Sequence, residues 1–152
     1  MTPAPAPGRV VALDLGQKRI GVAFSDSART LASPWGAVTR GGDENKDRAA
    51  IVAAVDEIGA VLVVVGLPLS LSGRAGPAAQ AALAEVEVLR TLLEPAGVAV
   101  ETADERLTTV EAQRSLTAQG RKGQAARQVI DSAAAMVLLQ AWIDGQRAHS
   151  RS

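Results

Sequence analysis

Two short apolar runs constrain the fold of this chain more than any other feature. They are residues 10–14, which end in Asp14, and residues 61–65, which are uninterrupted and mostly valine. β-Branched residues favour strands, and apolar runs of this length without polar alternation are typical of central strands buried on both faces. A sheet built from such strands needs a helical layer on each side, so we expect an α/β domain.

The remaining pattern predicts a mixed sheet flanked by helices. The turn at residues 16–18 separates the first run from a strand at 20–24, and so short a connection implies an antiparallel hairpin. The other expected elements are strands at 34–39 and 98–102 and helices at 43–59, 77–94, from 108, and 127–144. We expect one domain at 9–146, between a disordered Pro/Ala-rich tail at 1–8 and a polar tail at 147–152.

Composition argues against several classes of function. The chain has no cysteine and one histidine, His149, so disulfides and cysteine-based zinc sites are excluded and histidine catalysis is disfavoured. Lys plus Arg equals Asp plus Glu at 16 each, which disfavours a generally basic nucleic-acid binder but permits a local basic face. Neither a membrane span nor a signal peptide is recognisable, so a cytoplasmic protein with no membrane partner is expected.

Acidic residues stand where open α/β sheets carry their functional groups. Asp14 ends the first strand, and Asp104 and Glu105 follow the fifth, so all three should lie at the carboxyl edge of the sheet. Asp131 lies in the first turn of the last expected helix, in line with apolar residues, and should point inward. Convergent carboxylates without histidine or cysteine suit Mg²⁺ or Mn²⁺. Two such ions about 3.5–4 Å apart would support phosphodiester cleavage.

Each acidic residue also has a purely structural interpretation. The four alternatives are an Asx turn at Asp14, a turn cap at Asp104, a surface ion pair between Glu105 and Arg106, and an N-cap at Asp131 for a helix that starts at Ser132. The glycines after Asp14 also resemble the phosphate hairpin of actin-like ATPases, which need two such lobes. A chain of 152 residues holds only one.

Taken together, the motifs resemble the YqgF/RuvX family of Holliday-junction resolvases, also described as pre-16S rRNA nucleases. The matching segments follow the family's order and spacing and comprise residues 12–16, 19–23, 65–69 with Gly73, 104–112 and 131–135. The resemblance implies a ribonuclease H-like fold, distantly similar to the RuvC resolvase, with a five-stranded mixed sheet flanked by helices. It also implies a Mg²⁺- or Mn²⁺-dependent endonuclease.

The resemblance identifies Asp14, Glu105 and Asp131 as an acidic triad, and it prefers Glu105 to Asp104, which the residues alone left open. Our hypothesis is that Asp14 bridges two metal ions while Glu105 and Asp131 hold one each. The candidate cations for binding nucleic acid are Lys18, Arg19, Arg74, Arg106, Arg121, Lys122 and Arg127. The flexible loop at 120–124 is expected to move onto the nucleic acid near the site.

The substrate implied by the resemblance is either branched DNA or precursor rRNA. A resolvase that makes two symmetric cuts should be a homodimer. The competing functions are a non-catalytic RNA-binding ribosome-assembly protein and an actin-like nucleotide-binding half-domain.

Overall fold

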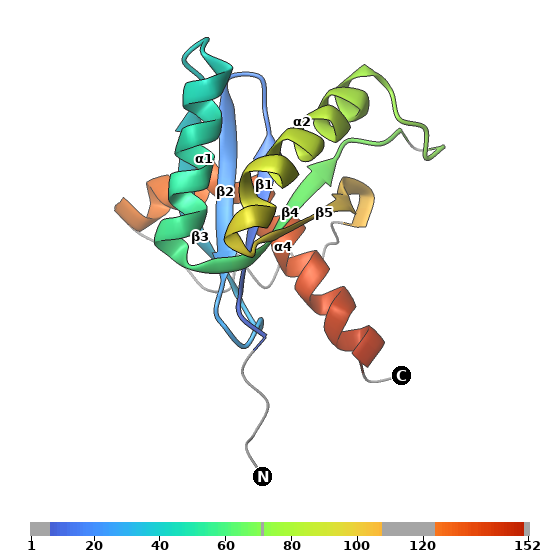
Figure 1. Ribbon diagram of the computed structural model, residues 1–152. Coiled ribbons are helices and arrows are strands. Elements are labelled where there is room, and N and C mark those ends of the chain that lie inside the picture. Colours follow the sequence, from blue (N-terminus) through green and yellow to red (C-terminus); the bar gives the residue numbers. More distant parts are fainter. Residues whose placement is uncertain (1–6, 71, 108–123, 151–152) are drawn as a thin grey trace.

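A five-stranded mixed sheet forms the centre of the molecule, as expected from the sequence (Figure 1). The computed structural model describes residues 7–70, 72–107 and 124–150. Across the sheet the strands follow the order β3-β2-β1-β4-β5. Their bounds are Arg9–Leu15 for β1, Arg19–Ser25 for β2, Ala32–Thr39 for β3, Ala60–Leu67 for β4 and Ala99–Asp104 for β5.

Strand pairing brings the carboxyl ends of three strands to one edge. β1 and β2 form the expected antiparallel hairpin, and β3 continues the antiparallel half of the sheet. β4 runs parallel to both β1 and β5, with Leu13 opposite Val65 and Gly66 opposite Ala103. Parallel strands of an open sheet present functional groups at this edge, so the topology gathers the ends of β1, β4 and β5 for a site.

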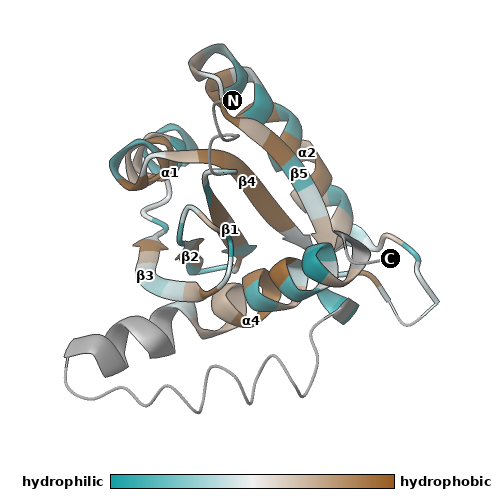
Figure 2. Cartoon of the chain, turned by 90° about the horizontal axis from the view of Figure 1, so that it is seen from below, coloured by the Kyte–Doolittle hydropathy of each residue, from teal (hydrophilic) through white to brown (hydrophobic). Residues whose placement is uncertain are grey.

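Helices cover both faces of the sheet. Helices α1 (Glu44–Ile58) and α2 (Pro77–Leu93) lie on one face, and α4 (Gln124–Ser150) crosses the other, as Figure 2 shows from below. Asp43 caps α1 because its carboxylate accepts hydrogen bonds from two backbone amides of the first turn. Short 3₁₀ turns, η1 (Glu94–Ala96) and η2 (Glu105–Leu107), precede and follow β5.

The two faces of the sheet carry separate apolar cores. Val11 and Leu13 belong to the core under α1 and α2, whereas Val10 and Ala12 belong to the core under α4. This alternation is the period of two of a β-strand. Burial of β1 on both faces explains why its sequence is a continuous apolar run.

The last helix begins earlier than expected, at Gln124 rather than residue 127, and continues past Asp144 to Ser150. Counted from Gln124, Asp131 is the eighth residue of α4, so it lies inside the helix and not in its first turn. The N-cap interpretation of Asp131 is therefore wrong. The helix expected from residue 108 and most of the loop before α4 lie outside the described residues. No helix in the described ranges is long and apolar enough to cross a membrane.

Candidate active site

Three positions at the carboxyl edge of the sheet lie on the face that α4 covers. Asp14 follows Ala12 with the period of the strand, and Gly66 follows Val64 in the same way on β4. Glu105 stands two residues after Ala103, which also belongs to this face. The carboxylates of Asp14 and Glu105 are therefore directed to the same side of β4, one from each neighbouring strand.

The Asp14 and Glu105 carboxyl groups hydrogen-bond to each other, and this contact changes the chemistry of Glu105. Burial and the nearby charge of Asp14 together raise the pKa of Glu105 from 4.5 to about 7. The hydrogen bond to Asp14 and the charge of Asp104 add to the same shift. All of these effects disfavour the ionised form of Glu105, so this carboxyl group is partly protonated near neutral pH.

Gly66 provides the space in which the two carboxylates meet. A Cβ atom at this position would lie 2.8 Å from Oε1 of Glu105 and 2.9 Å from Cδ2 of Leu138 on α4. Real Cβ atoms do not approach other heavy atoms so closely, so only glycine fits here without displacing the Glu105 carboxylate. In the sequence analysis Gly66 served only as part of the segment 65–69 that matches the family, whereas the structure places this glycine beside the Asp14–Glu105 pair.

Asp104 is turned away to a different partner. Its carboxylate binds the guanidinium of Arg106, with 2.9 Å from Nε to Oδ2, and also accepts a hydrogen bond from the Arg106 amide. These contacts lower the pKa of Asp104. The turn-cap interpretation of Asp104 is confirmed. The structural alternative for Glu105, an ion pair with Arg106, is wrong, because Asp104 forms that ion pair. The alternation of side chains after β5 separates the two neighbouring acids.

The turn after Asp14 is built from backbone contacts. The Gly16 amide donates to the carbonyl oxygens of Asp14 (3.1 Å) and Arg19 (3.0 Å). In this contact the acceptor on Asp14 is its carbonyl, whereas an Asx turn would use its carboxylate. The carboxylate is therefore directed to Glu105 instead of serving the turn.

The other expected site residues differ in their exposure and in whether the structure describes them. Lys18 and Arg19 are exposed on the β1–β2 turn, and Arg74 is exposed in the loop after β4. The Arg106 guanidinium forms an ion pair with Asp104. Its two terminal nitrogens lie 3.7 Å from the point where a Cβ atom of residue 73 would be. The positions outside the described residues are Arg121 and Lys122, and the side chains of Arg127 and Asp131 also lie outside the description.

A cavity of about 750 Å³ opens beside the carboxylate pair. Asp14, Glu105 and Gly66 line it from the sheet edge, and α1 and α2 contribute the opposite wall. Arg40 also lines this cavity, although the sequence analysis did not single it out. Its position could have pointed to the site, because Arg40 directly follows the third expected strand. If that strand pairs antiparallel with β2, its last residues lie beside the β1–β2 turn.

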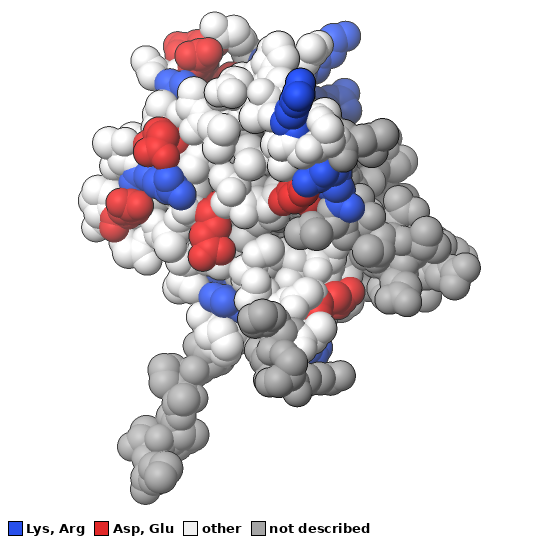
Figure 3. Space-filling model, turned by 90° about the vertical axis from the view of Figure 1, so that its right-hand side faces the viewer, with Lys and Arg blue, Asp and Glu red and all other residues white. Residues whose placement is uncertain are grey.

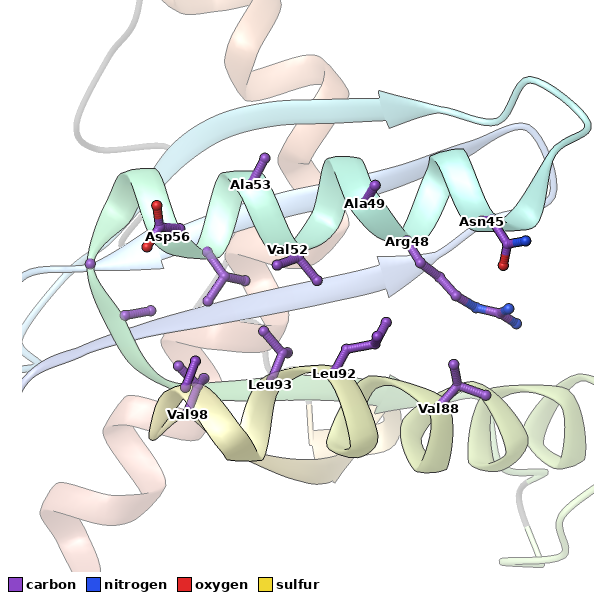
Figure 4. Close-up of a pocket in the computed structure, with 14 residues that line it drawn as sticks. Asn45, Arg48, Ala49, Val52, Ala53, Asp56, Val88, Leu92, Leu93 and Val98 are labelled. Atoms are coloured by element: carbon purple, nitrogen blue, oxygen red, sulfur yellow. The ribbon is translucent and has the colours of Figure 1, made fainter.

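A second hollow, about 780 Å³, lies between α1 and α2, and Arg48 lines both this hollow and the cavity of the carboxylate pair (Figure 4). Figure 4 shows Val52, Val88 and Leu92 directed into this groove from the two helices. Its lining is mostly aliphatic and contains no pair of carboxylates. The chemistry of the molecule is therefore assigned to the cavity beside Asp14 and Glu105 and not to this groove.

Charged side chains do not form one large basic surface on the face seen in Figure 3. Several Lys and Arg side chains gather at the upper right of this view, and elsewhere on the face Lys and Arg stand next to Asp and Glu. This agrees with the balance of charges in the sequence. Attraction of a polyanion to this face would depend on individual cations near the site, because the field of a mixed surface largely cancels.

The raised pKa of Glu105 predicts a pH-dependent gain in stability for Glu105→Gln. The folded protein binds the Glu105 proton more tightly than the unfolded chain, so the stability that Glu105 contributes is present at low pH and is lost as pH rises from 4.5 to about 7. With solvent screening of a half-buried group, Glu105→Gln should raise the free energy of unfolding by about 1 kcal/mol at pH 8. At pH 4 the variant and the wild type should be equally stable.

Urea unfolding at both pH values, in the presence of a chelator, measures this difference. A constant difference between the two proteins across this range would mean that the folded protein does not raise the pKa of Glu105.

The sequence profile of the RuvX family, described as Holliday junction resolvase, matches residues 8–145. A protein of Mycolicibacterium paratuberculosis, described as "Putative pre-16S rRNA nuclease", is 46% identical over 147 residues, which cover 97% of this chain and 86% of the relative. A protein of Nocardia farcinica with the same description is 46% identical over 153 residues, which cover 97% of this chain and 84% of the relative.

Two solved structures share the fold. T. thermophilus RuvC in complex with a Holliday junction substrate superposes with a TM-score of 0.60 at 13% identity, covering 93% of this chain and 96% of that chain. The yeast mitochondrial Holliday junction resolvase Ydc2 gives a TM-score of 0.53 at 12% identity, covering 99% and 84%. These likenesses confirm the ribonuclease H-like fold.

Proposed function

This chain belongs to the RuvX family, a family of nucleases, and we propose that it is a divalent-metal-dependent endonuclease that hydrolyses phosphodiester bonds of nucleic acid. One observation carries the proposal: two carboxyl groups hydrogen-bond to each other at the mouth of a cavity, and the charge of Asp14 disfavours ionisation of Glu105. Two partly buried carboxyl groups in contact cost free energy unless a cation or another polar partner compensates their charge.

The residues of this pair fit a hard divalent cation. Asp14 and Glu105 offer only oxygen donors, and Mg²⁺ and Mn²⁺ prefer oxygen. A divalent cation held there would stabilise negative charge at the phosphate and make an attacking water available near neutral pH. We assign Asp14 and Glu105 to hold it, with Asp131 of α4 as the third ligand on the strength of the family resemblance.

The chain's own residues would act by positioning. Asp14 is carried by a strand that is paired on both sides, so its backbone is rigid. Glu105 begins η2 directly after β5, and its carboxylate reaches Asp14 across the space left by Gly66. Fixed ligands cost little reorganisation when a substrate arrives, and this supports catalysis rather than binding alone.

We propose the 5′ end of precursor 16S rRNA as the favoured substrate and a four-way DNA junction as the second candidate. The relatives at 46% identity carry the rRNA description, whereas the likeness to RuvC concerns the fold. A junction resolvase would make two symmetric cuts and therefore act as a homodimer, whereas trimming of an rRNA end needs a single cut.

The matched pair Glu105→Gln and Asp104→Asn tests the function. Each variant removes one negative charge from adjacent residues, but only Glu105 contacts Asp14. With labelled precursor RNA and a four-way junction in Mg²⁺ or Mn²⁺, the wild type and Asp104→Asn should cleave at similar rates. Glu105→Gln should lose about two orders of magnitude or more, and chelation should stop every protein.

The relative rates on the two substrates decide between rRNA and junction DNA. Absence of cleavage by the wild type on both substrates, in either metal, contradicts the proposal and favours the non-catalytic assembly protein. Equal rates for the two variants would instead remove Glu105 from the site.

A further inference from the structure

Arg40 is held against the turn that follows Asp14. Its backbone amide donates to the Lys18 carbonyl at 2.9 Å, and its Nε donates to the Gly16 carbonyl at 2.7 Å. Two bonds from one residue to the same turn fix the direction of the guanidinium. Arg40 is half-buried, which restricts its side chain further.

The turn that anchors Arg40 is itself compact. A Cβ atom at Gly16 would lie 2.5 Å from the Arg19 carbonyl oxygen, so this position requires glycine. The carbonyl of Gly16 is therefore a rigid acceptor only two residues from Asp14. An arginine bound to it through Nε keeps its two terminal nitrogens for another partner, because guanidinium has five N–H donors.

The position of Arg40 connects two cavities. It lines the cavity of Asp14 and Glu105, and it also lines a neighbouring hollow of about 580 Å³ with Lys18 and Arg19. The cationic side chains of Lys18, Arg19 and Arg40 therefore lie together between the exposed turn and the carboxylate pair. Of these three, Arg40 also lines the cavity of Asp14 and Glu105.

The other arginine of the carboxylate cavity is already committed. Arg48 binds Glu85 through Nε, with distances of 3.0 Å and 2.8 Å to the two carboxylate oxygens, and one of its terminal nitrogens lies 3.5 Å from the Glu44 carboxylate, so two acids balance its charge. These contacts raise the pKa of Arg48. Among the described residues, Gly16 is the acceptor that the structure gives for the Arg40 side chain. Of the two, Arg40 has the donors for a ligand.

We propose that Arg40 is a substrate-binding residue that holds a backbone phosphate next to the bond to be cleaved. The inference rests on the proposed nuclease function and adds a specific contact to it. A guanidinium forms paired hydrogen bonds with phosphate oxygens, and anchoring through Nε presets the geometry. The two carboxylates beside it repel a phosphate unless a cation lies between them, so Arg40 would seat the strand while the carboxylates serve the reaction.

Binding measured in the presence of a chelator tests this contact without cleavage. The probe is the fluorescently labelled precursor RNA, titrated at several salt concentrations with wild type, Arg40→Gln, Arg40→Lys and Lys46→Gln. Lys46 is an exposed cation at the start of α1 and lines none of these cavities, so Lys46→Gln removes the same charge away from the site.

Arg40→Gln should weaken binding about tenfold and reduce the slope of log K against log salt by about 0.7–0.9. Arg40→Lys should keep the slope but lose part of the affinity, because lysine has no Nε to anchor on Gly16. Lys46→Gln should match the wild type in affinity, with a smaller change in slope than Arg40→Gln.

An Arg40→Gln protein with wild-type affinity and slope overturns the proposal. So does a loss of affinity with an unchanged salt slope and a lowered urea midpoint, because that combination identifies Arg40 as a structural clamp of the turn. If the wild type binds the RNA but never cleaves it with Mg²⁺ or Mn²⁺, the nuclease proposal fails while the Arg40 contact is still decided by the binding data.

Discussion

Asp14→Asn should lower the rate of nucleic-acid cleavage about a thousandfold, at the upper end of what one lost electrostatic contact costs at a reaction centre. Asparagine keeps the shape of aspartate but removes the charge that a divalent cation needs. The protein should remain folded, because the backbone at residue 14 pairs with Gly21 across the hairpin whatever its side chain. Removal of the repulsion with Glu105 should even raise the unfolding midpoint.

Single-turnover cleavage with Mg²⁺ and Mn²⁺, together with urea unfolding, measures both effects. Asp56→Asn is the matched control, because Asp56 is exposed on α1 and lines the apolar groove instead of the carboxylate cavity. Wild-type cleavage by Asp14→Asn would exclude this carboxylate from the reaction. A decrease of the same size in Asp56→Asn would show that the loss reflects net charge and not the site.

Gly66→Ala should lower cleavage about a hundredfold, which is the size of effect expected when reacting groups shift by about an ångström. The added methyl would occupy the space between the Glu105 carboxylate and Leu138 of α4. Glu105 is the more exposed of the two, so its side chain should move away from Asp14 while Leu138 adjusts little. The cost in stability should be about 1–3 kcal/mol, typical of overpacking.

Gly145→Ala is the matched control for this substitution. Gly145 lies on α4 with open space where a Cβ would be, so alanine should stabilise the helix by about 0.5–1 kcal/mol and leave cleavage unchanged. The pKa of Glu105, followed by NMR, separates two explanations of a slow Gly66→Ala enzyme. A value returned toward 4.5 indicates that Glu105 has left Asp14, whereas a value near 7 would contradict the displacement.

Local sequence patterns predicted most of the architecture. The valine-rich run became β4, the apolar run ending at Asp14 became β1, and the glycine-bounded turn joined an antiparallel hairpin. Helix α1 follows Asp43 and stops at Gly59, whose φ of 76° suits glycine. Strand propensity, capping and turn chemistry act within a few residues, so they can be interpreted without knowing the fold. The start of α4 was expected at residue 127, three residues later than its start at Gln124.

The candidate site was only partly predictable. The sequence placed Asp14, Asp104 and Glu105 at one sheet edge and named the family, but the residues alone could not choose between the two neighbouring acids. In the structure the Glu105 carboxyl group hydrogen-bonds to Asp14, and the Asp104 carboxylate forms an ion pair with Arg106. That choice depends on how the chain leaves β5 and enters η2, which sets the side on which each carboxylate emerges.

Gly66 and Arg40 acquire their roles only through contacts between distant segments. Gly66 matters because β4 lies between β1 and β5, so its missing side chain lets two carboxylates meet across it. Arg40 matters because β3 returns alongside β2 and ends beside the turn at Gly16. The sequence therefore determined which elements form and which family the chain resembles. Strand order and register decided which side chains meet, because these properties arise from pairing between segments far apart in the chain.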